Sequence, residues 1–185
     1  MDDAEVPEVL VSVDIETSGQ SPSVGSMLSI GACLVNDPEV QLYLELRPLP
    51  DRTWSDEAAR VHRLDRARLE EEGLPPGTAM ERFAAWLIDA CGRHSRPIFV
   101  GFNAPFDWMF VADYFWRYHG RNPFGVSALD LKSYYMGREG VALWSETRRA
   151  FVDRQLRLDP DHSHHALDDA RGQAVIARVL LGREP

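Results

Sequence analysis

Residues 9–17 read V-L-V-S-V-D-I-E-T, a run rich in β-branched residues that carries two carboxylates near its end. Side chains two positions apart point to the same face of a strand, so Asp14 and Glu16 share one face, roughly 7 Å apart. At an effective dielectric constant of ~20, two carboxylates at that separation repel each other by about 2 kcal/mol. The segment therefore predicts a buried strand whose end holds a cation, or an exposed strand end at which water screens both acids.

The rest of the chain predicts a mixed architecture of strands and helices. Two further strands are expected at residues 27–35 and 40–46, and the turn-forming residues between the three strands indicate a three-strand meander. The later strands are expected at 97–102 and 127–131, and the helices at 78–91, 105–119, 146–156 and 166–181. This order predicts an α/β or α+β layer fold with a mixed sheet, in a single domain spanning residues 1–185.

The composition is ordinary for a globular domain: the chain has 185 residues, of which 44% are hydrophobic and 26% charged. Two cysteines are too few for a disulfide framework, and no apolar run approaches the roughly 20 residues of a membrane span. The first residues, M-D-D-A-E-V-P-E, are acidic where a secretory signal is basic and then apolar. We therefore expect a cytoplasmic protein with free thiols. The net charge of −9 argues against holding long nucleic acids by charge alone.

A third acid, Asp107, follows a predicted strand in the segment F-V-G-F-N-A-P-F-D, residues 99–107. Acids are favoured in the first turn of a helix, where the partial positive charge of the helix end stabilises them. The place where a strand passes into a helix is also where open α/β sheets bind ligands. Asp107 is therefore either a helix-stabilising acid or part of a ligand site.

Histidines and acids also gather before the last predicted helix. His162, His164 and His165 precede Asp168 and Asp169, which open that helix. One interpretation is a polar loop followed by an acidic helix start, and another is a zinc site, since histidine is a common zinc ligand. Zinc is disfavoured because no cysteine lies nearby and no H-x-x-x-H pair is present. Oxygen ligands without sulfur favour Mg²⁺ or Mn²⁺ instead.

Three of these segments together resemble the three motifs of the DEDD-type 3′–5′ exonucleases, a family named after its four acids. The segments are V-D-I-E-T at 13–17, N-A-P-F-D at 103–107 and H-H-A-L-D-D-A at 164–170, and they occur in the family's order. The resemblance is to the histidine-bearing subtype, typified by RNase T, oligoribonuclease and the proofreading subunit of DNA polymerase III. It spans residues 13–170 and implies a ribonuclease H-like fold, in which a five-stranded mixed sheet begins with a three-strand meander.

The resemblance also implies a site and a reaction. The four acids that it maps onto this sequence are Asp14, Glu16, Asp107 and Asp169. They would hold two Mg²⁺ or Mn²⁺ ions, and His164, five positions before the last acid, would act as general base in a reaction that releases nucleoside 5′-monophosphates. His162 or His165 as the base, and Asp168 as the ligand, are the alternative registers.

Substrate contacts follow the same mapping. The backbone at Ile15 and Thr17 would hold the terminal 3′-hydroxyl, as in relatives. Phe102 and Phe106 flank the second motif and either stack on the last bases, at roughly 1–3 kcal/mol per base, or pack in the core. Asn103 would orient substrate or backbone, or cap the helix. Phe102 departs from many relatives, which carry a histidine there.

Single-stranded RNA or DNA 3′ ends are the expected substrate, with no membrane partner. No side chain indicates recognition of a 2′-hydroxyl, so the sequence does not distinguish an RNA substrate from a DNA substrate. Many relatives form homodimers, which makes a homodimer one expected state. The alternatives to an exonuclease are a ribonuclease H-like module that binds nucleic acid without catalysis and a metal phosphohydrolase of small phosphoesters. The presence of all four acids and the histidine favours the exonuclease.

Overall fold

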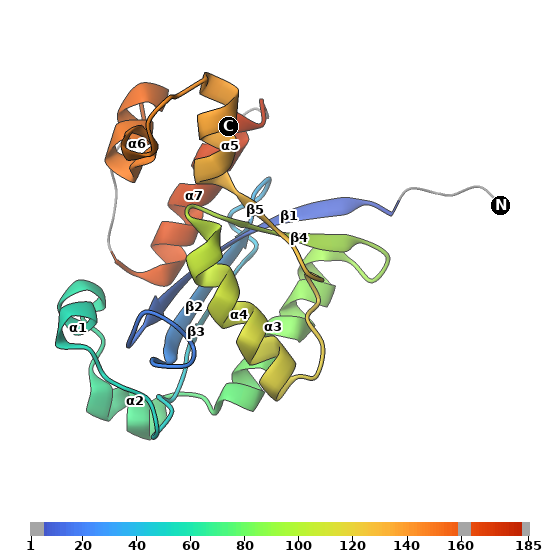
Figure 1. Cartoon of the computed structure of the whole chain (residues 1–185). Helices are drawn as coiled ribbons and strands as arrows, with labels where there is room; N and C mark the ends of the chain where they lie inside the picture. Colours follow the sequence, from blue (N-terminus) through green and yellow to red (C-terminus); the bar gives the residue numbers. More distant parts are fainter. Residues whose placement is uncertain (1–5, 159–163, 183–185) are drawn as a thin grey trace.

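The computed structural model describes residues 6–158 and 164–182, and Figure 1 shows their arrangement. A five-stranded sheet with the order β3-β2-β1-β4-β5 forms its centre. The strands are β1 (Glu8–Thr17), β2 (Met27–Leu34), β3 (Gln41–Glu45), β4 (Arg96–Gly101) and β5 (Ala128–Asp130). β2 pairs antiparallel with β1 and β3, whereas β4 runs parallel to β1 and β5. The predicted meander and the mixed sheet are therefore confirmed.

Helices surround the sheet in the described part of the chain. They are α1 (Asp56–His62), α2 (Arg66–Glu72), α3 (Pro76–Cys91), α4 (Ala104–Tyr118), α5 (Leu131–Glu139), α6 (Arg149–Leu156), α7 (Ala166–Leu180) and a 3₁₀ turn, η1 (Trp144–Thr147). The expected helices at 78–91, 105–119 and 166–181 correspond to α3, α4 and α7. Among the described residues, no helix is long and apolar enough to span a membrane.

The sequence analysis did not predict α1, α2 and α5. Each is seven to nine residues long, too short to display a periodic apolar face. Capping defines where they begin: the side chains of Ser55, Asp65 and Asp130 each accept a hydrogen bond from the backbone N–H three positions later. A single capping residue is a weaker sequence signal than a periodic face, which explains why these helices were missed.

The single helix expected over residues 146–156 is wrong, because the structure divides this stretch into η1 and α6. The Thr147 hydroxyl donates to the carbonyl of Trp144 at 2.7 Å and stabilises the 3₁₀ turn. Arg148 then adopts an extended conformation, with φ −63° and ψ 143°, before α6 begins at Arg149. The break reorients the chain, so α6 points its side chains in directions that a continuous helix would not allow.

The alternation of side chains along β1 divides the molecule into two layers. Val11, Val13 and Ile15 are buried with α3 and α4 on one face of the sheet. Ser12 and Asp14 lie on the other face, which α7 covers with support from α5 and α6 (Figure 1). Burying each aliphatic side chain stabilises the fold by roughly 1.5–3 kcal/mol. The apolar face of β1 thus supports the fold and leaves the polar face for the site.

The first turn of α7 lies very close to the sheet at Gly31. A Cβ on Gly31 would lie 2.2 Å from backbone atoms of Ala166 and Leu167, a distance that no side chain tolerates. In addition, the Ser12 hydroxyl donates to the carbonyl of Ala170 at 2.7 Å. Since Gly31 is the cross-strand partner of Asp14, the missing side chain brings the start of α7 next to this acid.

Gly31→Ala should therefore lower the free energy of unfolding by about 1–3 kcal/mol, because the added methyl group meets backbone that cannot rotate away. Urea denaturation of the metal-free protein measures the change. Gly137→Ala in α5 is the matched control, since a Cβ there meets nothing within 4 Å. That variant should gain up to about 1 kcal/mol from helix propensity. Equal stability of Gly31→Ala and the parent protein would contradict the close packing.

Candidate active site

Three carboxylates from two elements meet near the end of β1. Asp14 and Glu16 come from β1, and Asp169 comes from the first turn of α7. One carboxylate oxygen from each residue lies within 4.8 Å of the other two. We call these three side chains the carboxylate group. The close approach of α7 to the sheet therefore joins acids that are far apart in the sequence.

Asp107 approaches the same place from α4. Its side chain is buried, and its Oδ1 accepts a hydrogen bond from the N–H of Ile15 at 3.2 Å. Because Ile15 stands between the two acids of β1, this bond attaches α4 to the strand at the site. A second bond, from the N–H of Ala104 to Oδ1 of Asp130 at 3.0 Å, connects the start of α4 with the end of β5. The position of Asp107 is thus set by contacts with β1 and β5, the strands on either side of β4.

Gln173 is a site residue that the sequence analysis did not identify. It is buried on α7, one turn after Asp169 and on the same side of the helix. Its Nε2 donates to Oδ1 of Asp14, and its Oε1 accepts from the N–H of Phe102 at 2.9 Å. The amide therefore orients Asp14 and fixes the end of β4. The available signal was a polar residue among the alanines, Ala170, Ala174 and Ala177, of a buried helix face.

The acids raise one another's pKa. Burial is the largest cause at Asp14, whose pKa lies well above its usual value, and Asp107, Asp169 and Glu16 raise it further. Burial, then Asp169 and Asp107, raise the pKa of Glu16 to about 8. Burial also raises the pKa of Asp107 to about 8, although hydrogen bonds from the backbone oppose the shift. Ionising all four acids without a cation is costly. Donors that are all carboxylate oxygens suit a hard divalent cation.

The two described histidines of the last motif have different surroundings. His164 is exposed and has a φ of 53°, so the chain turns sharply just before α7. His165 is half-buried: its ring stacks on Tyr43 with the centroids 4.3 Å apart, and its Nδ1 lies 3.5 Å from Oδ2 of Asp168. The ring of His165 is thus engaged in packing, whereas the ring of His164 is accessible to solvent. His162 lies outside the described residues, and the choice of His164 as the base stays a prediction.

The two neighbouring acids at the start of α7 also differ. Asp168 is exposed, and its carboxylate lies 3.5 Å from both His165 and Arg171. Asp169 is half-buried and belongs to the carboxylate group. Of these two acids, the structure thus brings Asp169 to the site, which is the acid that the resemblance mapped there. Its role as a metal ligand stays a prediction.

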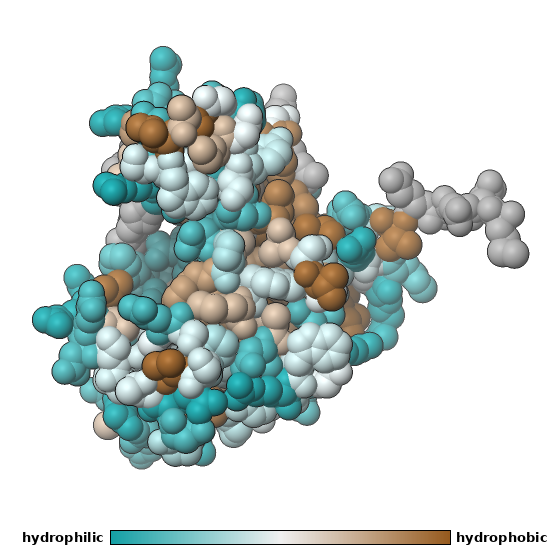
Figure 2. All heavy atoms as spheres, viewed as in Figure 1, coloured by the Kyte–Doolittle hydropathy of each residue, from teal (hydrophilic) through white to brown (hydrophobic). Residues whose placement is uncertain are grey.

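Two of the predicted substrate residues share a small cavity beside the end of β1. Its volume is about 180 Å³, and its lining includes Thr17, Ser55, Ala58, Val61 and Phe106. Figure 2 shows the surface recessed between the part that contains α1 and the part that contains α6. Ile15 does not line this cavity, because its side chain is in the core and its N–H binds Asp107.

Phe102 and Asn103 lie where β4 passes into α4. Phe102 packs against the layer that contains α7, and the guanidinium carbon of Arg149 lies 5.5 Å from its ring centroid. Asn103 is exposed and occupies the N-cap position of α4, as considered above, but its side chain makes no capping hydrogen bond. Its φ of 68° explains the residue type, because asparagine tolerates the left-handed conformation better than most residues.

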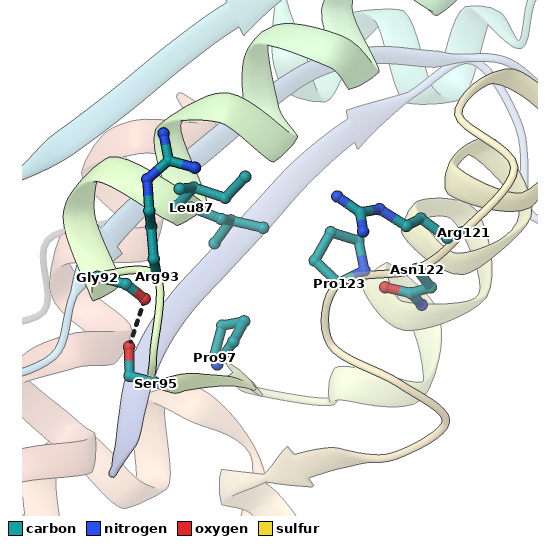
Figure 3. Close-up of a pocket in the computed structure, with 9 residues that line it drawn as sticks. Leu87, Gly92, Arg93, Ser95, Pro97, Arg121, Asn122 and Pro123 are labelled. Carbon is teal, nitrogen blue, oxygen red and sulfur yellow. Dashed lines mark hydrogen bonds between the residues drawn. The ribbon is translucent and has the colours of Figure 1, made fainter. Parts of the chain in front are cut away.

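A larger cavity, of about 410 Å³, lies far from these residues. It is lined by the end of α3, the start of β4 and the loop after α4 (Figure 3). Leu87, Pro97 and Pro123 form apolar walls, with Arg93 and Arg121 beside them. Because β4 starts there and ends at the acids, the two places are at opposite ends of the sheet. None of the predicted site residues lines this cavity.

A mixed sheet of this order, with acids on its central strand and on the first turns of two helices, is typical of the ribonuclease H-like fold. Residues 11–176 match the RNase_T family, which is described as exonuclease. The chain therefore belongs to the RNase T family of 3′–5′ exonucleases. Such an enzyme hydrolyses phosphodiester bonds, as the sequence analysis predicted.

The most informative relative in sequence is the 3′-5′ DNA exonuclease Cap18 of Escherichia coli. It is 41% identical over 173 residues, which cover 94% of this chain and 91% of the relative. A PolC-type DNA polymerase III of Thermotoga maritima is 28% identical over 92% of this chain, a match that covers 11% of the polymerase.

Solved structures confirm the fold. The nuclease domain of 3′hExo bound to rAMP aligns with a TM-score of 0.78 at 15% identity, covering 96% of this chain and 94% of that domain. Escherichia coli exonuclease I in complex with a dT13 oligonucleotide aligns with a TM-score of 0.73 at 16% identity, covering 96% of this chain and 42% of that protein. At these identities the likeness concerns the fold alone.

The raised pKa values predict how the stability of the metal-free protein depends on pH. With pKa values near 8 at Glu16 and Asp107, the folded chain retains protons that the unfolded chain releases above about pH 4.5. Because the folded state then binds more protons, stability should fall as pH rises from about 5 to 8. Thermal melts in EDTA at several pH values measure this slope.

Glu16→Gln should make the slope shallower, and so should millimolar Mg²⁺, because a bound cation favours the ionised acids. The exposed Glu81 of α3 provides the control variant, Glu81→Gln, which should leave the slope unchanged. A metal-free melting temperature that stays constant from pH 5 to 8 would contradict the mutual repulsion of the acids.

Proposed function

We propose that this enzyme removes nucleotides from the 3′ end of single-stranded DNA and releases nucleoside 5′-monophosphates. The observation that carries the proposal is the carboxylate group, whose oxygens lie within 4.8 Å of one another beside the end of β1. DNA is favoured over RNA because the relative that is 41% identical over nearly its whole length is a DNA exonuclease. The three acids of the carboxylate group are half-buried, which suits a strand end rather than a long duplex.

The proposed metal ligands are Asp14, Glu16, Asp107 and Asp169, which would hold two Mg²⁺ or Mn²⁺ ions. When bound, these ions supply an activated water and offset the negative charge of the phosphate. The chain's own residues orient the ligands. Gln173 holds Asp14, and the N–H of Ile15 holds Asp107, so neither carboxylate has to reorganise when a cation binds. All donors are oxygens, as the resemblance implied.

His164 is proposed as the general base that takes a proton from the attacking water. It lies two residues before α7 on a sharp turn and is exposed, so its ring is available to approach the acids from the solvent side. A base of this kind contributes typically ~10²–10⁴-fold to the rate. The neighbouring His165 is less suitable, because stacking on Tyr43 already occupies its ring.

The small cavity beside β1 is proposed to hold the terminal nucleotide. Thr17 and Phe106 line it together with the apolar Ala58 and Val61 of α1. A base that stacks on Phe106 needs no sequence-specific hydrogen bond, which suits an enzyme that removes any nucleotide. Thr17 is favoured over Ile15 for contact with the 3′-hydroxyl, since the N–H of Ile15 binds Asp107. Asn103, exposed at the start of α4, and the half-buried Phe102 before it are the remaining proposed substrate contacts.

A 5′-labelled single-stranded DNA oligonucleotide with Mg²⁺ or Mn²⁺ should give a ladder that shortens one nucleotide at a time. Asp14→Asn should abolish the ladder without loss of thermal stability, because it removes a charge from a repulsive group while keeping its shape. A gel with matched RNA and DNA oligonucleotides measures both activity and preference. Binding without cleavage by the parent protein would indicate a non-catalytic module. Cleavage of a small phosphodiester with an intact oligonucleotide would indicate a phosphohydrolase.

His164→Ala should lower the turnover rate by roughly 10²–10⁴-fold, because the attacking water loses its base. His165→Ala is the matched control on the adjacent position. It should lower the melting temperature through loss of the Tyr43 stack, with a much smaller effect on the rate. Single-turnover kinetics under saturating metal measure both variants. The larger rate loss in His165→Ala would show that the histidine register is shifted by one.

A further inference from the structure

Arg149 packs on Phe102, next to the second motif, although it belongs to none of the three motifs. It is the first residue of α6, and its side chain is 18% exposed. Burial and the neighbouring acids raise the pKa of Asp14, whereas the charge of Arg149 lowers it. The guanidinium is therefore close enough to act on an acid at the centre of the site.

Two contacts hold this guanidinium in place. Its Nε donates to both carboxylate oxygens of Asp153, at 2.9 and 3.2 Å, and Asp153 is only 2% exposed. The guanidinium carbon lies 5.5 Å from the ring centroid of Phe102, within the range of a cation–π contact. Gln173 binds the N–H of Phe102 with one end and Asp14 with the other. Phe102 and Gln173 thus connect Arg149 with Asp14.

The contact through Nε leaves the two terminal Nη groups of Arg149 for another acceptor. Within residues 6–158 and 164–182, its recorded hydrogen bonds are the two from Nε to Asp153. A guanidinium presents a planar fork of donors that matches the oxygens of a phosphate. An ion pair alone does not explain this placement, since replacing a buried pair with apolar residues is often neutral or stabilising. A cation whose charge acts on Asp14 also attracts an anionic substrate that the acids repel.

We propose that Arg149 binds a non-bridging oxygen of the scissile phosphate and that Asp153 is the positioning residue that orients its guanidinium. The inference rests on the proposed function, because it needs the scissile phosphate to lie at the carboxylate group. The guanidinium stays protonated throughout and stabilises the negative charge on the phosphate as water attacks. α6 therefore contributes to the reaction, although its sequence carries no exonuclease motif.

Two substrates test the assignment: a single-stranded DNA oligonucleotide and the p-nitrophenyl ester of thymidine 5′-monophosphate, which contains only the phosphodiester to be cleaved. Arg149→Gln should lower kcat/KM by about 10²–10³-fold on both, because both contain the scissile phosphate. Arg154→Gln is the matched control, since Arg154 lies exposed on the same helix. It should keep kcat/KM within twofold of the parent protein on the small substrate.

The role of Asp153 needs a measurement that a purely structural role would not change. Methylguanidinium added to Arg149→Ala should restore part of the lost activity by occupying the vacated position. The restoration should be weaker in Arg149→Ala/Asp153→Asn, which lacks the carboxylate that orients the guanidinium. Arg149→Gln leaves Asp153 buried without this partner, so Arg149→Gln/Asp153→Asn, which removes both charges, is measured as well. Circular dichroism melts confirm that each variant is folded.

Activity within twofold of the parent protein in a folded Arg149→Gln or in the folded double variant would overturn the proposal. A loss on the oligonucleotide alone would place Arg149 on a neighbouring phosphate and overturn the assignment to the scissile one. Equal rescue with and without Asp153 would overturn the positioning role. A parent protein inactive on both substrates with Mg²⁺ and Mn²⁺ would contradict the proposed function itself, so the two failures are distinguishable.

Discussion

The hydrogen bond from Ser12 to the carbonyl of Ala170 holds α7 against β1, and the bare backbone of Gly31 leaves room for that contact. The rest of the site depends on this approach. It brings Asp169 within 4.8 Å of two acids on β1, and it places Gln173 where its amide reaches Asp14. A helix held further from the sheet would leave each of these side chains in solvent.

Bringing the acids together lowers the stability of the metal-free fold. Burial and mutual repulsion raise the pKa of Asp14, Glu16 and Asp107, so the acids oppose the compact state whenever no cation is present. The apolar face of β1, buried with α3 and α4, supplies the compensating stability from the other side of the sheet. One strand thus carries the core on one face and the charged site on the other.

Much of this arrangement could be predicted from the sequence. The meander, three of the long helices and the four acids follow from periodicity, turn residues and the family motifs. Short helices such as α1 were not predicted, because they lack a periodic apolar face and the cap at Ser55 is only a local signal. Gln173 and Arg149 were not identified as site residues for a different reason. Neither lies in a motif, and each contacts a residue that is far away in the chain.

The sequence by itself determined the alternation along β1, the order of the motifs and therefore the family, because these depend on residue type and spacing. Only the tertiary structure decided that Asp169 rather than Asp168 joins the carboxylate group, and that stacking on Tyr43 occupies His165. It also decided that Asn103, at the N-cap position of α4, has a left-handed backbone and makes no side-chain cap. The physical reason is that adjacent residues at the start of a helix differ by about 100° in direction, and packing alone selects which of them faces the sheet.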